Sequence, residues 1–275
     1  MNTLLLILLP FGLALALACG VRLALGPERG ARMAAAAAVI AFLVTWGIVL
    51  RPGWFAYDSV GRIGHCAVGA MLTALVLDFL AAKRWCAYVA MAIVVLVSCW
   101  ASINHGLWPP QSFTLMKGAI LAVLAVGAFL VLMRLDALAP RELTAPITLG
   151  MLCFGLSAVA AVAGDSAIAA TALALAMAVA GYMVAAILVG LGPSRGLVLG
   201  AGVTMLATVW AFVDRNPHTA LGLIVLPLTL FAEGTAQRVP LPKAGITKIL
   251  YPVVLAAACA LPVVIAVLIT LAIRT

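Results

Sequence analysis

The sequence predicts an all-α, polytopic integral membrane protein, folded as a bundle of about ten transmembrane helices. Of its 275 residues, 67% are hydrophobic and only 9% are charged, and the mean hydropathy is +1.28. A soluble domain carries about 25% charged residues, so the ionic side chains here are too few to cover a water-soluble particle of this size. The apolar residues also gather in long runs. These observations exclude a soluble enzyme, a disordered chain and a secreted disulfide scaffold.

Ten stretches of the chain are long and apolar enough to be transmembrane helices, which need about 20 mainly apolar residues. They run over 3–25, 33–50, 63–81, 85–106, 115–134, 146–163, 167–190, 197–213, 218–233 and 249–273. Glycine, proline and charged residues separate them, because these residues interrupt helices or favour water. The apolar run 146–190 is too long for one span, so we expect a tight turn at 164–166, where Asp165 caps the next helix. Pro227 predicts that the short ninth span is broken.

The lysines and arginines predict the orientation of the chain. Eleven of them fall on one side of the alternating spans and five on the other. The smaller set is Arg51, Arg62, Lys117, Arg215 and Arg274. The positive-inside rule places the larger set in the cytoplasm, which puts both termini in the periplasm. An alanine-rich composition with more arginine than lysine is typical of a GC-rich bacterium, so we expect the cell inner membrane.

The net charge of +8 does not indicate a nucleic-acid partner, because the basic residues lie in short loops between apolar runs. The expected partner is the lipid bilayer, and subunits of a larger membrane complex are a further candidate. The first span has no basic residue before it and no clear small-residue cleavage site after it, so we expect a retained helix rather than a signal peptide. The six cysteines lie in or beside apolar runs without a CxxC pair, which is typical of buried small residues.

Two stretches of the chain resemble each other. Each begins with Gly-Pro-x-Arg-Gly, at 26–30 and at 192–196, and continues into an apolar span. Each ends with a tryptophan five residues before an arginine, Trp46 with Arg51 and Trp210 with Arg215. This similarity predicts an internal repeat of four helices, with units at 1–106 and 167–275 and two connecting helices at 107–166. The first and seventh spans have the same orientation, so the repeat is expected to be parallel.

The three histidines, His65, His105 and His218, all lie at span ends on the predicted outer side. Histidine binds zinc, copper and haem and exchanges protons near neutral pH, so a metal or proton site is one interpretation. The alternative is interfacial histidines that bond to backbone or water. The sequence has no HExxH or CxxCH motif, and it assigns no catalytic residue and no cofactor.

Two outer loops each hold an aspartate, an arginine and a histidine. These residues are Asp58, Arg62 and His65 in the first loop and Asp214, Arg215 and His218 in the second. The functional interpretation is a vestibule in which both sets bind or gate a substrate. The alternative is a set of ordinary ion pairs at helix ends, next to interfacial aromatic residues.

Asp78 and Glu233 are the two acids embedded most nearly in apolar sequence. An acid inside a span costs about 2.5–3.5 kcal/mol on insertion, which makes each a functional candidate. Nearby bases offer a simpler explanation, since each acid stands five residues before a base, Lys83 or Arg238. No acid or base is placed at the bilayer midplane, which disfavours a proton pump built on buried carboxylates.

The leading functional hypothesis is a permease-like transporter of a small solute or lipid-linked molecule, in which one four-helix unit rocks against the other. The outer charged residues and histidines would bind or gate the substrate. The second hypothesis is a non-catalytic membrane subunit or assembly factor, favoured by the scarcity of polar residues within the spans. The third is a membrane enzyme that uses the outer histidines with a metal or a lipid substrate.

Overall fold

The protein is a multi-pass helical bundle. The computed structural model describes residues 3–51, 59–80, 83–103, 115–140, 143–191, 195–239 and 247–274. These residues are 91% helical and include no strand. Ten spans within these residues, two of them made of several helical segments, are long and apolar enough to cross a membrane, as the sequence predicts.

The first five spans contain seven helical segments. They are α1 (Thr3–Leu25), α2 (Pro27–Met33), α3 (Ala36–Thr45), the π-helical turn η1 (Trp46–Leu50), α4 (Ser59–Phe79), α5 (Arg84–Ile103) and α6 (Leu115–Leu138). The second span starts earlier than predicted, because the Gly-Pro-Glu-Arg-Gly segment is helical from Pro27 onward. Only Gly26, with a φ of 81°, separates α1 from α2. Proline fits the first turn of a helix, where its missing N–H would have no partner.

The last five spans contain the two predicted interruptions. Their segments are α7 (Thr144–Ala163), α8 (Ser166–Val189), α9 (Arg195–Arg215), the 3-10 helices η2 (Thr219–Ile224) and η3 (Leu226–Phe231), α10 (Ala232–Ala236) and α11 (Thr247–Arg274). The turn between α7 and α8 is confirmed, with Gly164 at a φ of 91° and Asp165 as the N-cap of α8. The ninth span is indeed broken, because η2, η3 and α10 replace a continuous α-helix.

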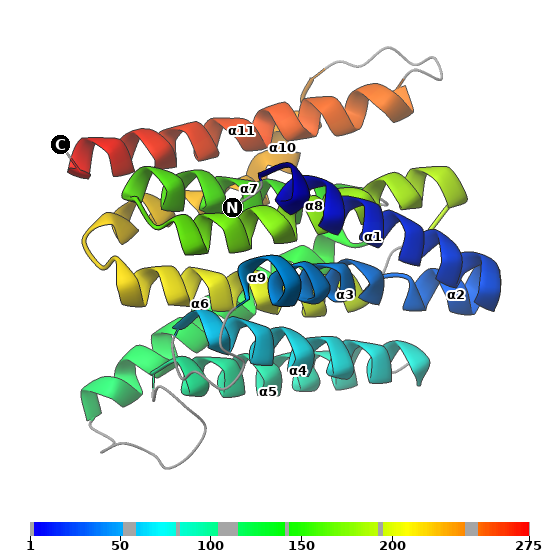
Figure 1. The fold of residues 1–275 in the computed structure, drawn as a ribbon, viewed down its shortest axis with the longest axis horizontal. Helices are drawn as coiled ribbons and strands as arrows, with labels where there is room; N and C mark the ends of the chain where they lie inside the picture. Colours follow the sequence, from blue (N-terminus) through cyan, green and yellow to red (C-terminus); the bar gives the residue numbers. More distant parts are fainter. Residues whose placement is uncertain are drawn as a thin grey trace.

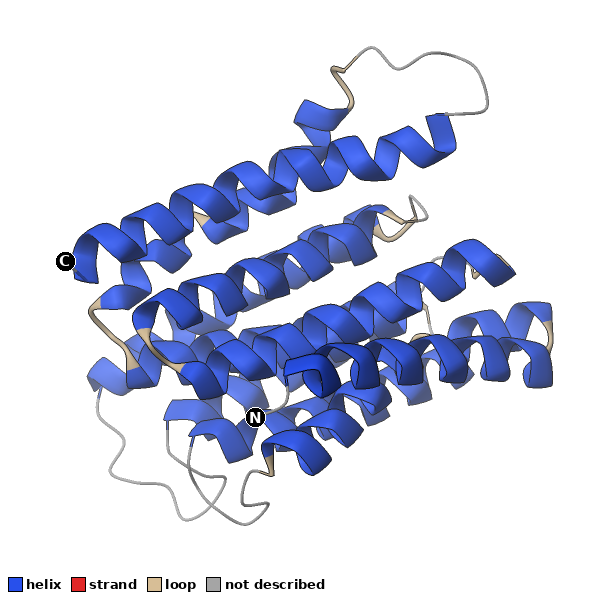
Figure 2. Ribbon diagram, turned by 45° about the horizontal axis from the view of Figure 1, so that its top comes forward, coloured by secondary structure: helices blue, strands red, loops and turns tan. Residues whose placement is uncertain are grey.

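The helices run side by side along one direction of the bundle, so successive loops alternate between its two ends (Figure 1 and Figure 2). Helix α9 lies inside the bundle, with 89% of its spanning window buried, whereas the peripheral α6 has only 17% buried. The most extensive contacts pair α1 with α8 and α4 with α9. Helices from the first and second halves of the chain therefore pack against each other.

Small residues allow this close packing. A Cβ atom added at Gly181 of α8 would lie 2.3 Å from the carbonyl oxygen of Phe11 in α1. A Cβ atom at Gly64 of α4 would lie 2.3 Å from the ring of Trp46, which is completely buried. Small residues at such crossings let helix backbones approach in a bilayer, where van der Waals packing drives association.

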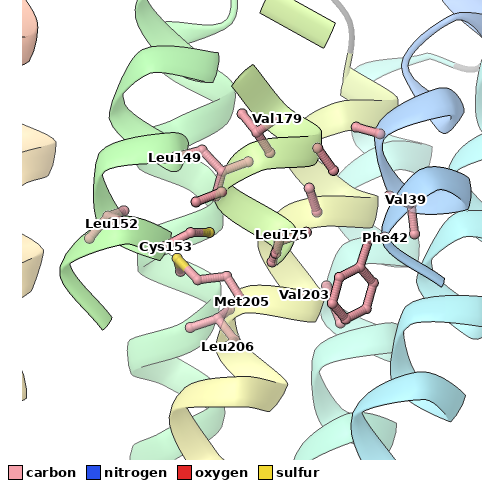
Figure 3. Close-up of a cluster of buried hydrophobic side chains, with 14 of the residues drawn as sticks. Val39, Phe42, Leu149, Leu152, Cys153, Leu175, Val179, Val203, Met205 and Leu206 are labelled. Atoms are coloured by element: carbon pink, nitrogen blue, oxygen red, sulfur yellow. The ribbon is translucent and has the colours of Figure 1, made fainter. Parts of the chain in front are cut away.

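Apolar side chains fill the space between α3, α7, α8 and α9 (Figure 3). The side chains drawn in Figure 3 include Phe42 of α3, Cys153 of α7, Leu175 of α8 and Val203 of α9, which belong to one buried cluster. All four side chains are at most 1% exposed. The core between these four helices is therefore apolar.

Candidate functional site

Arg62 of α4 and Asp214 of α9 form an ion pair at one end of the bundle, which we call the Asp214 end. The Nη2 atom of Arg62 lies 3.3 Å from Oδ2 of Asp214. The Nη1 atom of Arg62 donates to the carbonyl oxygens of Ser102, at 2.6 Å, and Ala101, at 3.4 Å, near the end of α5. Terminal carbonyls of a helix lack intrahelical donors, so one guanidinium joins α4, α5 and α9.

A small cavity adjoins this ion pair. Its volume is about 10 Å³, and its lining includes Cys66, Ser102 and Trp210 as well as both charged residues. A cavity of this size holds about one water molecule. The Arg62 side chain is only 11% exposed, whereas Asp214 is 43% exposed. The contact between α4 and α9 is therefore closed to a solute in this conformation.

Arg215 pairs with a residue outside the predicted vestibule. Its Nε atom lies 3.0 Å from Oδ2 of Asp165, and Asn216 Nδ2 donates to the same oxygen at 3.0 Å. The other carboxylate oxygen, Oδ1, accepts the Ile168 backbone N–H at 3.2 Å. The sequence identified Asp165 only as a capping residue. Asp165 is the one charged residue in a long apolar run, and this isolation could have indicated a buried acid with a partner.

The two histidines that the structure describes take no part in these ion pairs. His65 is exposed on α4, and its Nδ1 atom lies 3.1 Å from the Gly61 carbonyl oxygen one turn earlier. His218 is exposed immediately before η2 and makes no capping hydrogen bond. His105 and Asp58 lie outside the described residues. Within the described part of the chain, no three His, Cys, Asp or Glu side chains are grouped as metal ligands would be.

The opposite end of the bundle holds a second ion pair, and we call it the Glu233 end. Glu233 of α10 is 4% exposed, and its Oε2 lies 4.0 Å from Nη2 of Arg134 in α6. Gln237 Nε2 donates to Oε1 of Glu233 at 2.9 Å. Arg134 also donates to the Leu230 carbonyl oxygen at 3.3 Å and covers the Phe231 ring at 5.4 Å, a cation–π distance. Arg134 is thus a partner of Glu233 that local sequence spacing did not indicate.

Two further acids lie in the half of the bundle toward the Glu233 end. Asp78 is partly buried on α4. Asp136 of α6 is 8% exposed and accepts a 3.2 Å hydrogen bond from the Tyr88 hydroxyl of α5. Sequence reasoning missed Asp136, because a tyrosine hydroxyl 48 residues earlier in the chain leaves no local signal.

The Asp214 end therefore holds two separate ion pairs. The pair of Arg62 and Asp214 joins α4, α5 and α9, and the pair of Arg215 and Asp165 joins α8 and α9. Neither a protein-family model nor a curated protein matches this chain.

Proposed function

We propose that this protein is a permease-like transporter of a small solute or lipid-linked molecule. The observation that carries the proposal is the ion pair between Arg62 and Asp214. It joins two helices that pack along each other but lie far apart in the chain, next to a cavity of water size. In the proposal this pair is the gate of the Asp214 end.

An ion pair suits a gate that opens and closes. A pair between solvent-exposed side chains stabilises by about 0–1 kcal/mol, and Asp214 is 43% exposed. Water then replaces the partner of each charge when the helices separate. The pair between Arg134 and Glu233 at the opposite end would be the second gate, because alternating access requires one end to close while the other opens.

Irregular backbone supplies candidate hinges for this motion. The second span changes from α-helix to π-helix at Trp46, and the ninth span is built from two 3-10 helices that meet at Val225. Short 3-10 and π segments within helices often mark hinges or functional sites. Broken spans are also frequent where transporters bind substrate.

The substrate is proposed to be largely apolar or to carry a lipid tail. The core between α3, α7, α8 and α9 is apolar (Figure 3), so a strongly hydrated solute would lose its water without compensation. A molecule with apolar surface would enter between helices at a smaller cost. This argument favours lipid-linked molecules over ions.

The proposed setting is the inner membrane of a bacterium, with the Asp214 end in the periplasm. Eleven lysines and arginines against five support this orientation. The proposed moving parts are the repeated four-helix units at 1–106 and 167–275, on the basis of the shared Gly-Pro-x-Arg-Gly segments. Since α1 packs along α8 and α4 along α9, motion would occur by sliding at these two contacts.

Cys66 provides a test that needs no knowledge of the substrate, because this residue lines the cavity beside Arg62 and Asp214. The other five cysteines are replaced by alanine or serine, and intact cells are treated with a membrane-impermeant maleimide. We expect slow labelling of Cys66 in this background and labelling at least several-fold faster after Asp214→Asn. Asp214→Glu is the matched control, since it keeps the charge and should label slowly. Equal labelling of all three proteins would overturn the gate.

One observation favours a second candidate function, a non-catalytic subunit or assembly factor of a membrane complex. The filled apolar core gives no polar route through the part of the bundle in Figure 3. This candidate predicts a partner at fixed stoichiometry after purification in mild detergent, measured by native mass spectrometry. It also predicts that Asp214→Asn leaves Cys66 labelling unchanged.

A further inference from the structure

The turn between α7 and α8 brings several polar groups together at the Asp214 end. Asp165 occupies its centre, and its side chain is only 5% exposed. Both carboxylate oxygens already have donors, since Oδ2 is bound by Arg215 and Asn216 and Oδ1 by the Ile168 N–H. Asp165 therefore holds Arg215 in place while its own acceptor atoms are occupied.

An open cleft of about 250 Å³ lies at this turn. Asp165, Ser166, Arg215 and Asn216 contribute its polar lining, together with small residues of the turn. Most other space inside the bundle is filled by apolar side chains. The cleft is thus polar and lies at the ends of the spans, near the expected membrane surface.

A second arginine reaches the same turn from α11. Arg274 donates through Nη1 to the carbonyl oxygen of Val162 at the end of α7. Its guanidinium lies over Gly164, because a Cβ atom added at Gly164 would be 3.6 Å from Nη2 and 3.8 Å from Cζ. Three helices therefore deliver charged groups to one turn: Asp165 before α8, Arg215 from α9 and Arg274 from α11.

The charges at this turn do not balance. Two guanidinium groups and one carboxylate lie at this turn, which leaves a net charge of one positive unit from these three residues. Asp165 and Arg215 line the cleft, and Arg274 lies beside Gly164, which also lines it. Arg215 uses only Nε for Asp165. Within the described part of the chain, the terminal nitrogens of Arg215 and the Ser166 hydroxyl have no other hydrogen-bond partner. Unpaired donors of Arg215 and Ser166 therefore lie at the cleft, next to a net positive charge.

We propose that this cleft binds a phosphate group, with Arg215 and Arg274 as its cationic ligands and Ser166 as a further donor. Arginine pairs with phosphate through two parallel N–H···O bonds. Basic recesses between helices near a membrane surface are typical sites for phosphate-bearing headgroups. The phosphate belongs either to an anionic phospholipid or to a water-soluble phosphate ester. This site is separate from the Arg62–Asp214 pair and does not depend on transport.

Binding is measured on the purified full-length protein with two kinds of probe. The lipid probe is phosphatidylglycerol in nanodiscs, compared with phosphatidylcholine and followed by native mass spectrometry. The soluble probes are inorganic phosphate and glycerol phosphate, followed by calorimetry. Arg274→Gln is the principal variant because no acid depends on its charge in the described contacts. Arg215→Lys is the second, since it retains a charge for Asp165 but loses the planar fork.

Arg51→Gln is the matched control. Arg51 lies at the same end of the bundle and is exposed, and among the described residues its side chain bonds only to the local Ile48 carbonyl oxygen, at 3.2 Å. A hydrogen bond between charged groups contributes enough that its loss weakens binding by about tenfold. We expect Arg274→Gln and Arg215→Lys each to weaken binding by about this factor, and Arg51→Gln to leave it unchanged.

Selective binding of phosphatidylglycerol alone supports the proposal with a lipid as the source. Binding of the soluble probes alone supports it with a soluble ester as the source, and binding of both supports the shared phosphate chemistry. The proposal is overturned if the unaltered protein prefers neither probe over its control. It is also overturned if Arg51→Gln weakens binding as much as Arg274→Gln does.

Discussion

Arg62 and Asp214 stand 152 positions apart in the chain, yet their side chains lie 3.3 Å apart at the end of the bundle. The two partners are not equivalent. Arg62 is 11% exposed and also donates to the carbonyl oxygens of Ser102 and Ala101, whereas Asp214 is 43% exposed. The arginine therefore carries more of the connection among α4, α5 and α9 than the aspartate does.

This asymmetry predicts unequal effects on stability. Asp214→Ala should lower the free energy of unfolding by about 0–1 kcal/mol, as expected for a solvent-screened pair. Arg62→Ala should cost about 1.5–3 kcal/mol, because it also leaves carbonyl oxygens of α5 without a charged donor. Unfolding of the detergent-solubilised protein in SDS measures both. Equal losses of unfolding free energy in the two variants would contradict the conclusion that Arg62 connects three helices.

The crossing of α1 and α8 predicts a steric effect at Gly181. Gly181→Ala places a Cβ atom 2.3 Å from the Phe11 carbonyl oxygen, so the two backbones must separate, at a cost of about 1–3 kcal/mol. Gly12→Ala in α1 is the control, because a Cβ atom there meets nothing within 4 Å. We expect a lower midpoint of thermal unfolding for the first variant and not for the second. A Gly181→Ala protein as stable as the original would show that the helices are not this close.

The broken ninth span is held against α11 at Gly222. A Cβ atom at this position would lie 2.1 Å from Thr270 Oγ1 and 2.8 Å from the Ala266 carbonyl oxygen. Gly222→Ala should therefore destabilise the protein by about 1–3 kcal/mol. Gly234→Ala in α10 belongs to the same span and meets nothing within 4 Å, so it should be neutral. Similar unfolding midpoints for both variants would rule out the contact with α11.

Two substitutions of Asp165 should lower the stability of the protein by different amounts. Asp165→Ala removes the N-cap of α8 and the partner of Arg215, and loss of a cap alone costs about 0.5–2 kcal/mol. Asp165→Asn keeps an oxygen that accepts the Ile168 N–H, so it should cost clearly less. Thermal unfolding in detergent ranks the two variants. The capping role would be refuted if asparagine were as harmful as alanine.

Local sequence was sufficient to predict the spans, because the transfer of apolar residues into a bilayer is governed by composition over about 20 residues. It also predicted the turn at Asp165 and the break near Pro227, which depend on the residues of the turn itself. The helical Gly-Pro-Glu-Arg-Gly segment was read as an interruption, since the sequence does not distinguish a proline that starts a helix from one that ends it.

The neighbours of each helix were not predictable in this way. In a membrane every span is apolar on most faces, so hydrophobic periodicity does not indicate which face packs inward. The close approach of Gly181 to Phe11 depends on shape at two distant positions. The pairing of Glu233 with Arg134 likewise depends on how α6 and α10 meet. The sequence grouped Arg62 with Asp214 only by assigning both to the same side of the membrane.

The proposed gate requires ten crossings that place Arg62 and Asp214 at the periplasmic face. Sandwich insertions of alkaline phosphatase and of green fluorescent protein into the full chain test this directly. Phosphatase should be active after Arg51, Ile103, Gly164 and Pro217, and fluorescence should appear after Gly26, Leu80, Pro140, Gly190 and Val239. Two consecutive loops reporting from the same side would contradict the ten crossings. A complete inversion of the pattern would contradict the periplasmic placement of the Arg62–Asp214 pair.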